Sequence, residues 1–139
     1  MEYKRIDKSQ IEALWELQIL YKSEIGENEP QDEEKVRLTK AIVENRIVFF
    51  GAFVEDVLVG SCSITVGFST FDYLPCGVFE DFYIHPDYRH KGIARHLVQY
   101  AYRKGGISSM TVGCADCDIK MYHALGFSIP LGNLLAFEE

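Results

Sequence analysis

Basic side chains gather in one short stretch, residues 89–94 (RHKGIA), of a chain whose formal net charge is -7. A run of β-forming residues precedes this stretch and ends at Pro86, because proline donates no ladder hydrogen bond. Apolar residues then recur at helical spacing, at Ile93, Leu97, Val98 and Ala101. A helix that begins directly after a loop leaves unpaired backbone N–H groups at its positive end, where phosphate oxygens bind readily. The pattern therefore predicts a phosphate-binding turn between a strand and a helix.

Two motifs in this part of the chain resemble those of a known family. The pattern Arg89-x-x-Gly92-x-Ala94 resembles the R/Q-x-x-G-x-G/A signature with which GNAT-type N-acetyltransferases hold the pyrophosphate of acetyl-CoA. Residues 122–127 (YHALGF) are similar to the Y-x-x-L-G-F that closes the family's second CoA-contacting segment. The order and the spacing of the two motifs both fit, and the resemblance covers residues 76–128.

The resemblance implies acetyl-CoA as co-substrate. No metal is expected, because the histidines and cysteines lack the spacing of metal ligands. The resemblance assigns the pyrophosphate to the turn and the start of the following helix, that is, to Arg89, His90, Lys91, Gly92, Ile93, Ala94 and Arg95. It also implies that the backbone of Phe82, Tyr83 and Ile84 pairs with the pantetheine arm as an added strand would.

The chemistry of amine acetylation needs a base. An amine with a pKa of ~10.4 is almost wholly protonated at pH 7, and removing its proton costs about 4–5 kcal/mol. The resemblance gives this role to Glu80, acting directly or through an ordered water. Strand alternation predicts Glu80, Phe82 and Ile84 on one face and Asp81 and Tyr83 on the other. A β-bulge would shift this alternation and favour Asp81 as the base, and a third possibility is that neither carboxylate has this role.

The departing thiolate of CoA needs a proton donor, and the resemblance assigns Tyr122 to it. A phenol with a pKa of ~10 is protonated at pH 7, and that pKa lies close to the pKa of a thiol. The alternative is that Tyr122 is a half-buried helix residue without a catalytic part. Many relatives carry Asn seven residues before this tyrosine, where this chain has Ala115, so the local contacts to CoA are expected to differ.

Periodicity along the chain predicts an α/β fold with helices on both faces of the sheet. Strands are expected at about 3–6, 46–54, 57–66, 76–84 and 109–113, with one or two short strands after residue 126. Helices are expected from Ser9, whose spacing to Glu12 fits a capping box, from Pro30, from residue 93 to Lys104, and over 116–125. The resemblance implies the GNAT acyl-CoA N-acyltransferase fold, with a mixed, mostly antiparallel sheet that splays after its fourth strand.

Length, composition and charge limit the number of domains and the kinds of partner that the protein can have. The 139 residues are expected to form a single N-acetyltransferase domain over 1–139. No apolar run approaches the ~20 residues that span a bilayer. No apolar signal segment follows the first residues, so no membrane is expected and the cytoplasm is the expected location. The acidic balance argues against nucleic acid as a partner.

The expected acceptor is a primary amine of a small cationic molecule, a polyamine or a peptide. Glu24, Glu27 and Glu29, together with an aromatic loop at 67–75, could bind an ammonium group, although a solvated acidic loop is an equally good interpretation. A homodimer is left open. One alternative function is a non-catalytic acyl-CoA-binding module, and another is a thiol-redox protein that uses Cys114 and Cys117. We expect these two cysteines to be ordinary reduced thiols.

Overall fold

A five-stranded sheet runs through the protein, and the computed structural model describes all of its residues, 1–139. The strands lie side by side in sequence order: β1 (Glu2–Arg5), β2 (Val48–Val54), β3 (Val57–Ser69), β4 (Leu74–Ile84) and β5 (Ser109–Val112). The first four strands pair antiparallel, whereas β5 joins β4 in parallel. The prediction of a mixed, mostly antiparallel sheet is therefore confirmed.

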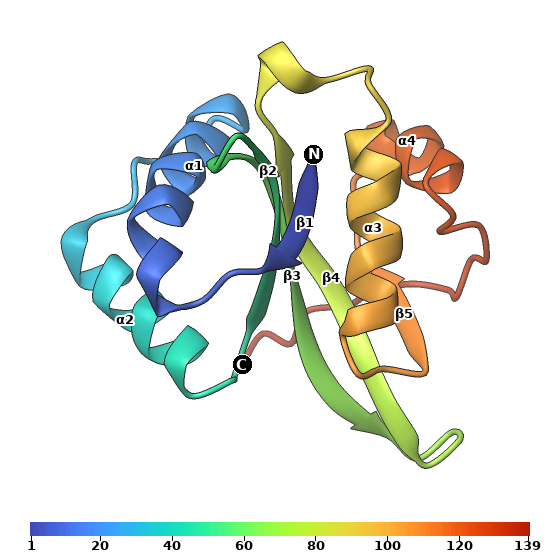
Figure 1. Ribbon diagram of the computed structural model, residues 1–139. Coiled ribbons are helices and arrows are strands. Elements are labelled where there is room, and N and C mark those ends of the chain that lie inside the picture. The colour runs from blue at the N-terminus through green and yellow to red at the C-terminus, as the bar shows by residue number, and fades with distance from the viewer.

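Helices cover both faces of this sheet, as the sequence predicted (Figure 1). The α-helices are α1 (Ile11–Glu24), α2 (Asp32–Val43), α3 (Ile93–Lys104) and α4 (Ile119–Ala124), and the 3-10 turns are η1 (Lys8–Gln10), η2 (Pro86–Tyr88) and η3 (Asp116–Asp118). Helices α1 and α2 lie on one face and α3 on the other. None of these helices is both long and apolar enough to cross a lipid bilayer.

The sheet separates two apolar cores, and alternation along β2 contributes to both. Phe49 and Phe53 pack with α1 and α2, whereas Phe50 packs with α3 on the opposite face. Burial of a large apolar side chain contributes about 1.5–3 kcal/mol, so these alternating residues fix the sheet between its helices. The core on the α3 face includes Phe79 of β4, which is the strand that leads into the basic turn.

Both N-terminal helices begin at other residues than predicted. The first capping box uses Asp7, whose side chain accepts a 2.8 Å hydrogen bond from the Ser9 amide, and Gln10, whose side chain accepts from the Asp7 amide. The predicted pair of Ser9 and Glu12 is therefore wrong. Helix α2 begins at Asp32, after Gln31 as its N-cap, so the proline at position 30 lies before the helix rather than in its first turn.

The two hairpins of the sheet differ in how well the sequence predicted them. The predicted strands before residue 55 and after residue 56 are confirmed as a hairpin, whose turn residues Glu55 and Asp56 have positive φ, at 49° and 66°. The loop expected at 67–75 is wrong, because the β3–β4 ladder continues to the pair Ser69 and Leu74. The side chains there are mostly exposed on both faces, so no burial pattern marked the extension of the strands.

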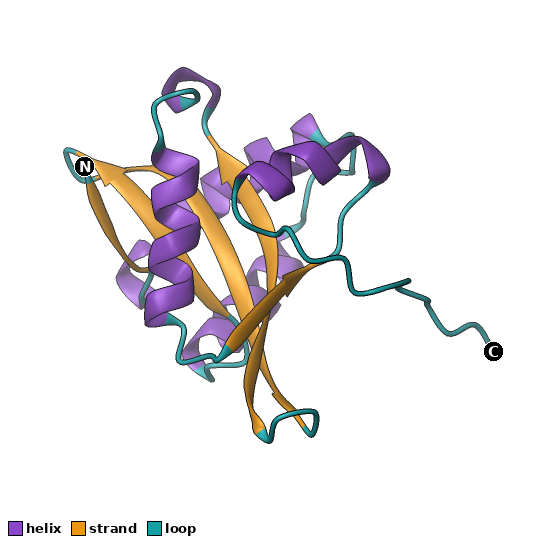
Figure 2. Cartoon of the chain, turned by 90° about the vertical axis from the view of Figure 1, so that its right-hand side faces the viewer, coloured by secondary structure: helices purple, strands orange, loops and turns teal.

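The end of the chain also departs from expectation, because residues 125–139 contain no helix or strand. The predicted splay, by contrast, is present. Strand β5 pairs with β4 only as far as the pair Phe79 and Val112, and beyond it the edge of β4 is open. Figure 2 shows β5 diverging from the direction of the other strands.

Candidate active site

A β-bulge interrupts β4 just where the sheet opens. Ser63 pairs with Glu80, and Ser61 pairs with Tyr83. Between these two pairs β4 therefore advances by three residues while β3 advances by only two. The extra residue is accommodated at Asp81, which has a φ of 53°. Few residues other than glycine adopt this left-handed region, and aspartate and asparagine are among those that do.

The bulge changes which side chains share a face. Tyr83 packs into the core under α1, whereas Phe82 and Ile84 pack into the core under α3. Glu80 lies on the α1 face, opposite Ser63 and on the same side as Tyr83. The predicted grouping of Glu80 with Phe82 and Ile84 is therefore wrong, because simple alternation does not count the extra residue.

The two neighbouring carboxylates have different surroundings. Asp81 is half-buried, and its Oδ2 accepts a 2.7 Å hydrogen bond from Ser63 Oγ. Glu80 is exposed, and its carboxylate bonds no other side chain of the protein. Both carboxylate oxygens of Glu80 are therefore free of protein partners, whereas one oxygen of Asp81 accepts from Ser63.

Tyr122 of α4 lies across the open edge of β4. Its ring centroid is 6.3 Å from that of Phe82 and 5.8 Å from that of Phe127. Burial raises the pKa of Tyr122 to about 12, and Tyr21, Asp118 and Cys114 add to the rise. The phenol is therefore a weaker acid than the sequence argument assumed.

Tyr21 of α1 belongs to the same site, although residue types and spacing did not single it out. Its ring centroid is 6.0 Å from that of Tyr83. Burial raises the pKa of Tyr21, and the negative charge of Asp81 raises it further. Tyr21 therefore packs beside Tyr83, two residues after the bulge residue Asp81. Its position on the apolar face of a helix made it look like an ordinary core residue.

The basic turn presents a series of unpaired backbone amides. The Arg89 amide donates to Pro86 O and the His96 amide donates to Gly92 O, but no amide between them donates to an acceptor in the protein. His90 and Gly92 both have positive φ, at 62° and 81°. Successive amides in such a conformation form a concave site at the positive end of a helix, of the kind that binds phosphate groups.

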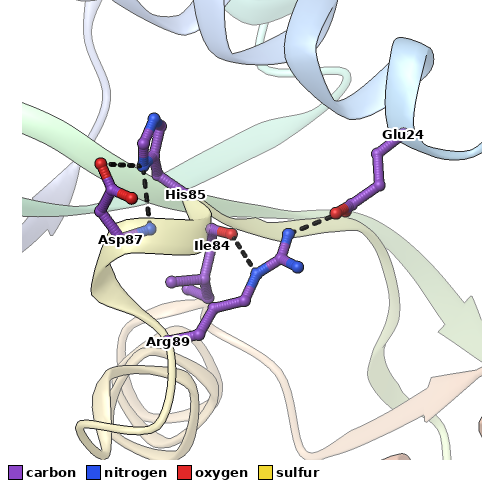
Figure 3. Close-up of polar contacts among 5 residues, drawn as sticks. All are labelled: Glu24, Ile84, His85, Asp87 and Arg89. Carbon is purple, nitrogen blue, oxygen red and sulfur yellow. Dashed lines mark hydrogen bonds and ion pairs between the residues drawn. The ribbon is translucent and has the colours of Figure 1, made fainter.

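The basic side chains of this turn are engaged to different degrees. Arg89 Nε donates a 2.8 Å hydrogen bond to Ile84 O, and its Nη2 donates to a Glu24 carboxylate oxygen at 2.8 Å (Figure 3). Arg95 Nη2 donates to Ala124 O of α4 at 2.8 Å. Lys91 is exposed, as is His90. Two of the four basic side chains, Arg89 and Arg95, therefore donate hydrogen bonds to other groups of the protein.

The open edge of β4 offers backbone groups as a strand would. The His85 amide donates to Val59 O of β3 at 2.8 Å, so alternation directs the N–H and C=O groups of Ile84 and Phe82 away from β3. Ile84 O already accepts a hydrogen bond from Arg89 Nε. The remaining groups of this edge are suited to an extended amide-containing ligand.

The acidic residues that were expected to bind the ammonium group of the acceptor are only partly free to do so. Glu24 is paired with Arg89, and Glu27 accepts a 2.9 Å hydrogen bond from Lys22 Nζ. The aromatic residues expected beside the acceptor lie at the tip of the β3–β4 hairpin, at the opposite end of β4 from the basic turn (Figure 1). The hairpin tip therefore does not border Glu80.

The cysteines and histidines form no evident site of their own. Cys114 and Cys117 are exposed and unbridged, and Cys62 is buried. No group of three or more His, Cys, Asp or Glu residues is arranged to hold a metal ion.

Comparisons with known proteins agree with this geometry. The model of the acetyltransferase (GNAT) family matches residues 11–127. No curated protein matches the chain. Several solved structures share the fold at low sequence identity, which by itself supports the fold alone.

Three of these structures are informative. A probable acetyltransferase is 21% identical, with a TM-score of 0.83 and 100% of both chains covered. A predicted acetyltransferase from Clostridium acetobutylicum, solved with acetyl-CoA, is 18% identical, with a TM-score of 0.75 over 99% of this chain and 95% of that one. An aminoglycoside acetyltransferase from an uncultured soil metagenomic sample, solved with sisomicin, is 14% identical, with a TM-score of 0.83 over 99% and 95%. The matched segment includes the bulge, the turn of amides and Tyr122, and the chain belongs to the GNAT family of acetyl-CoA-dependent acetyltransferases.

Proposed function

We propose that the protein transfers the acetyl group of acetyl-CoA to a primary amine of a small cationic molecule by direct attack, with no acyl-enzyme. The observation that carries this proposal is the free carboxylate of Glu80 beside the bulge, where the sheet opens next to the turn of unpaired amides. In this proposal Glu80 takes the proton of the ammonium, directly or through water.

The co-substrate would lie along the open edge of β4. The amides of residues 90–95 would bind the pyrophosphate, and His90 and Lys91 would add positive charge beside it. The free backbone groups of Phe82 and Ile84 would pair with the pantetheine arm. Acetyl-CoA itself supplies a thioester whose C–S bond breaks as the new C–N bond forms.

Asp81 has a supporting part in this proposal. Its carboxylate already accepts a hydrogen bond from Ser63, so it is better suited to hold the bulge and to add negative charge near the ammonium. The bulge is the arrangement that would favour Asp81 as the base, but Glu80 is the more exposed of the two carboxylates and bonds no other side chain. Glu80 therefore remains the proposed base.

Tyr122 would assist the departing thiolate by donating a hydrogen bond. Its pKa of about 12 exceeds the ~8.5 of an ordinary thiol, so complete transfer of its proton is unfavourable. A hydrogen bond from a neutral phenol still stabilises negative charge on sulfur. The proton that finally reaches the thiolate would come from solvent or from the base.

The preference for a cationic acceptor rests on charge. The negative charges of Asp81 and, more weakly, Glu80 raise the pKa of Tyr21, and carboxylates near an aromatic side chain favour ammonium groups. Two structural neighbours point to small-molecule amines, namely the aminoglycoside acetyltransferase with sisomicin and AAC(6')-Iy with a bisubstrate analog of acetylneamine. The latter is 17% identical, with a TM-score of 0.81 over 99% of this chain and 97% of that one.

Release of CoA thiol from acetyl-CoA across a panel of monoamines, polyamines, aminoglycosides and peptides tests the proposal. We expect turnover with a small cationic amine, and we expect Glu80→Gln and Tyr122→Phe to lower kcat while the Kd for CoA stays within about twofold. Glu16→Gln and Tyr102→Phe, which change exposed residues away from the site, are matched controls. Binding of CoA without turnover of any amine would instead indicate a non-catalytic acyl-CoA-binding module.

A further inference from the structure

The side chain of Arg89 joins its turn to the edge of β4, five residues before it, and to the end of α1, 65 residues before it. Its Nε donates to Ile84 O at the open edge of β4, and its Nη2 donates to Glu24 at the end of α1. The guanidinium carbon also lies 5.4 Å from the ring centroid of Tyr83. Figure 3 shows the guanidinium turned toward β4 and α1, with Glu24 reaching it from the other side.

The contacts are suited to positioning rather than to bulk stability. The side chains of Arg89 and Glu24 are 35% and 45% exposed, and pairs of that exposure contribute little to folding. The geometry is nevertheless specific, because a planar guanidinium donates in fixed directions to a carbonyl and a carboxylate at once. Arg89 is also the residue from which the turn of amides begins, so whatever orients Arg89 orients that turn.

We propose that Arg89 is a positioning residue in this protein rather than a ligand of the pyrophosphate. Through Glu24 it fixes the phosphate-binding turn to the end of α1, three residues after Tyr21. The turn that binds CoA and the helix that borders the proposed acceptor site therefore move as one unit. The part concerning the acceptor rests on the proposed function, whereas the part concerning CoA does not.

The opposite possibility makes an opposite prediction for Glu24. If Arg89 turned to the pyrophosphate, it would have to leave both Glu24 and Ile84 O, and Glu24 would compete with the phosphates for it. Glu24→Gln would then leave CoA binding unchanged or strengthen it. If Arg89 instead holds the turn in place, Glu24→Gln loosens the turn and weakens CoA binding, although Glu24 itself never contacts CoA.

Calorimetric titration of CoA, without any acceptor, distinguishes the two. The proteins are the unchanged chain, Glu24→Gln, Arg89→Gln, Arg89→Lys and the double variant with Gln at both positions, with Glu16→Gln on the exposed side of α1 as control. We expect each Gln variant to raise the Kd for CoA about three- to tenfold. We expect the double variant to be no worse than the poorer single variant, since both changes break one unit. Arg89→Lys should not restore binding, because an ammonium lacks the planar fork.

Two outcomes would overturn the proposal. One is a Kd for CoA that is unchanged or lower in Glu24→Gln while Arg89→Gln raises it, which would make Arg89 a direct ligand. The other is a double variant whose losses simply add, which would make the two residues independent. Thermal unfolding of each variant is measured alongside, and Glu24→Gln alone decides the question if Arg89→Gln fails to fold. None of these Kd values depends on which amine is the acceptor. A result that overturns the positioning role of Arg89 is therefore distinct from a result that overturns the proposed function.

Discussion

Ser63 Oγ donates a 2.7 Å hydrogen bond to Asp81 Oδ2 across the register shift between β3 and β4. Ser63 is only 1% exposed, whereas Asp81 has the positive φ that the bulge requires. A buried hydroxyl on the regular strand therefore secures the strained residue on the bulged strand. Strain of this kind persists only where the surroundings enforce it.

Removal of that hydroxyl should disturb both the fold and the reaction. Ser63→Ala removes a charge-assisted hydrogen bond, so we expect a loss of about 1–2 kcal/mol in the free energy of unfolding. We also expect kcat to fall several-fold, because Glu80 sits directly beside the bulge. Denaturant titration and steady-state kinetics measure the two effects. Ser61→Ala, at a residue that is also 1% exposed, is the control. Equal kcat values for the two variants would contradict the proposed link.

Substitutions of Asp81 itself should separate its backbone role from its charge. An alanine at this φ costs about 1–2 kcal/mol relative to a residue that tolerates the left-handed region. We therefore expect Asp81→Ala to be less stable than both Asp81→Asn and Asp81→Gly in denaturant titrations. We expect Asp81→Asn to retain more kcat than Glu80→Gln, since Glu80 is the proposed base. If Asp81→Ala proved as stable as Asp81→Gly, the bulge would not need a positive φ in solution.

Gly92 offers a second test with a matched control elsewhere in the chain. Its φ is 81°, and a Cβ built there comes no closer than 3.9 Å to the ring of His96, so conformation rather than space requires glycine. Gly106 has a similar φ of 68° and open surroundings, but lies at the far end of α3. Alanine at either position should cost about 1–2 kcal/mol of stability.

Only Gly92→Ala should also weaken CoA binding, by about tenfold or more, because only Gly92 shapes the turn of amides. Thermal unfolding and calorimetric titration of CoA on both variants make the comparison. Similar CoA affinities in the two variants would mean that the turn does not need this conformation to bind its ligand.

Much of the fold could be predicted because its signals are local. The apolar face of α3 and the turn at Glu55 and Asp56 follow from short stretches of sequence. The bulge was anticipated only as an alternative, because the extra residue exists only relative to the pairing with β3. The face occupied by Glu80 therefore depended on a partner strand, and simple alternation failed there.

The site was predictable to a similar extent. The motif that begins at Arg89 located the turn, but the direction of its side chain depends on Glu24, which lies 65 residues earlier. Tyr21 was missed for the same reason, since it becomes a candidate only when α1 is placed beside β4. Residue types and spacing therefore identified the segments that form the site. Tertiary contacts determine which of their side chains bond other parts of the protein and which are free to contact a ligand.

Tyr122 should leave a distinct mark on the pH dependence of stability. Its pKa is raised by burial to about 12 in the folded protein, against ~10 in the unfolded chain. Between these values the folded protein binds the proton that the unfolded chain has lost, so stability falls as pH rises. The unchanged protein should therefore lose stability faster than Tyr122→Phe above about pH 10.

Other tyrosines with raised pKa values, such as Tyr21, are present in both proteins and cancel in the difference. Urea midpoints from pH 8 to about 11.5 measure it. Parallel curves for the two proteins over this range would mean that the phenol is open to solvent and that its pKa is ordinary.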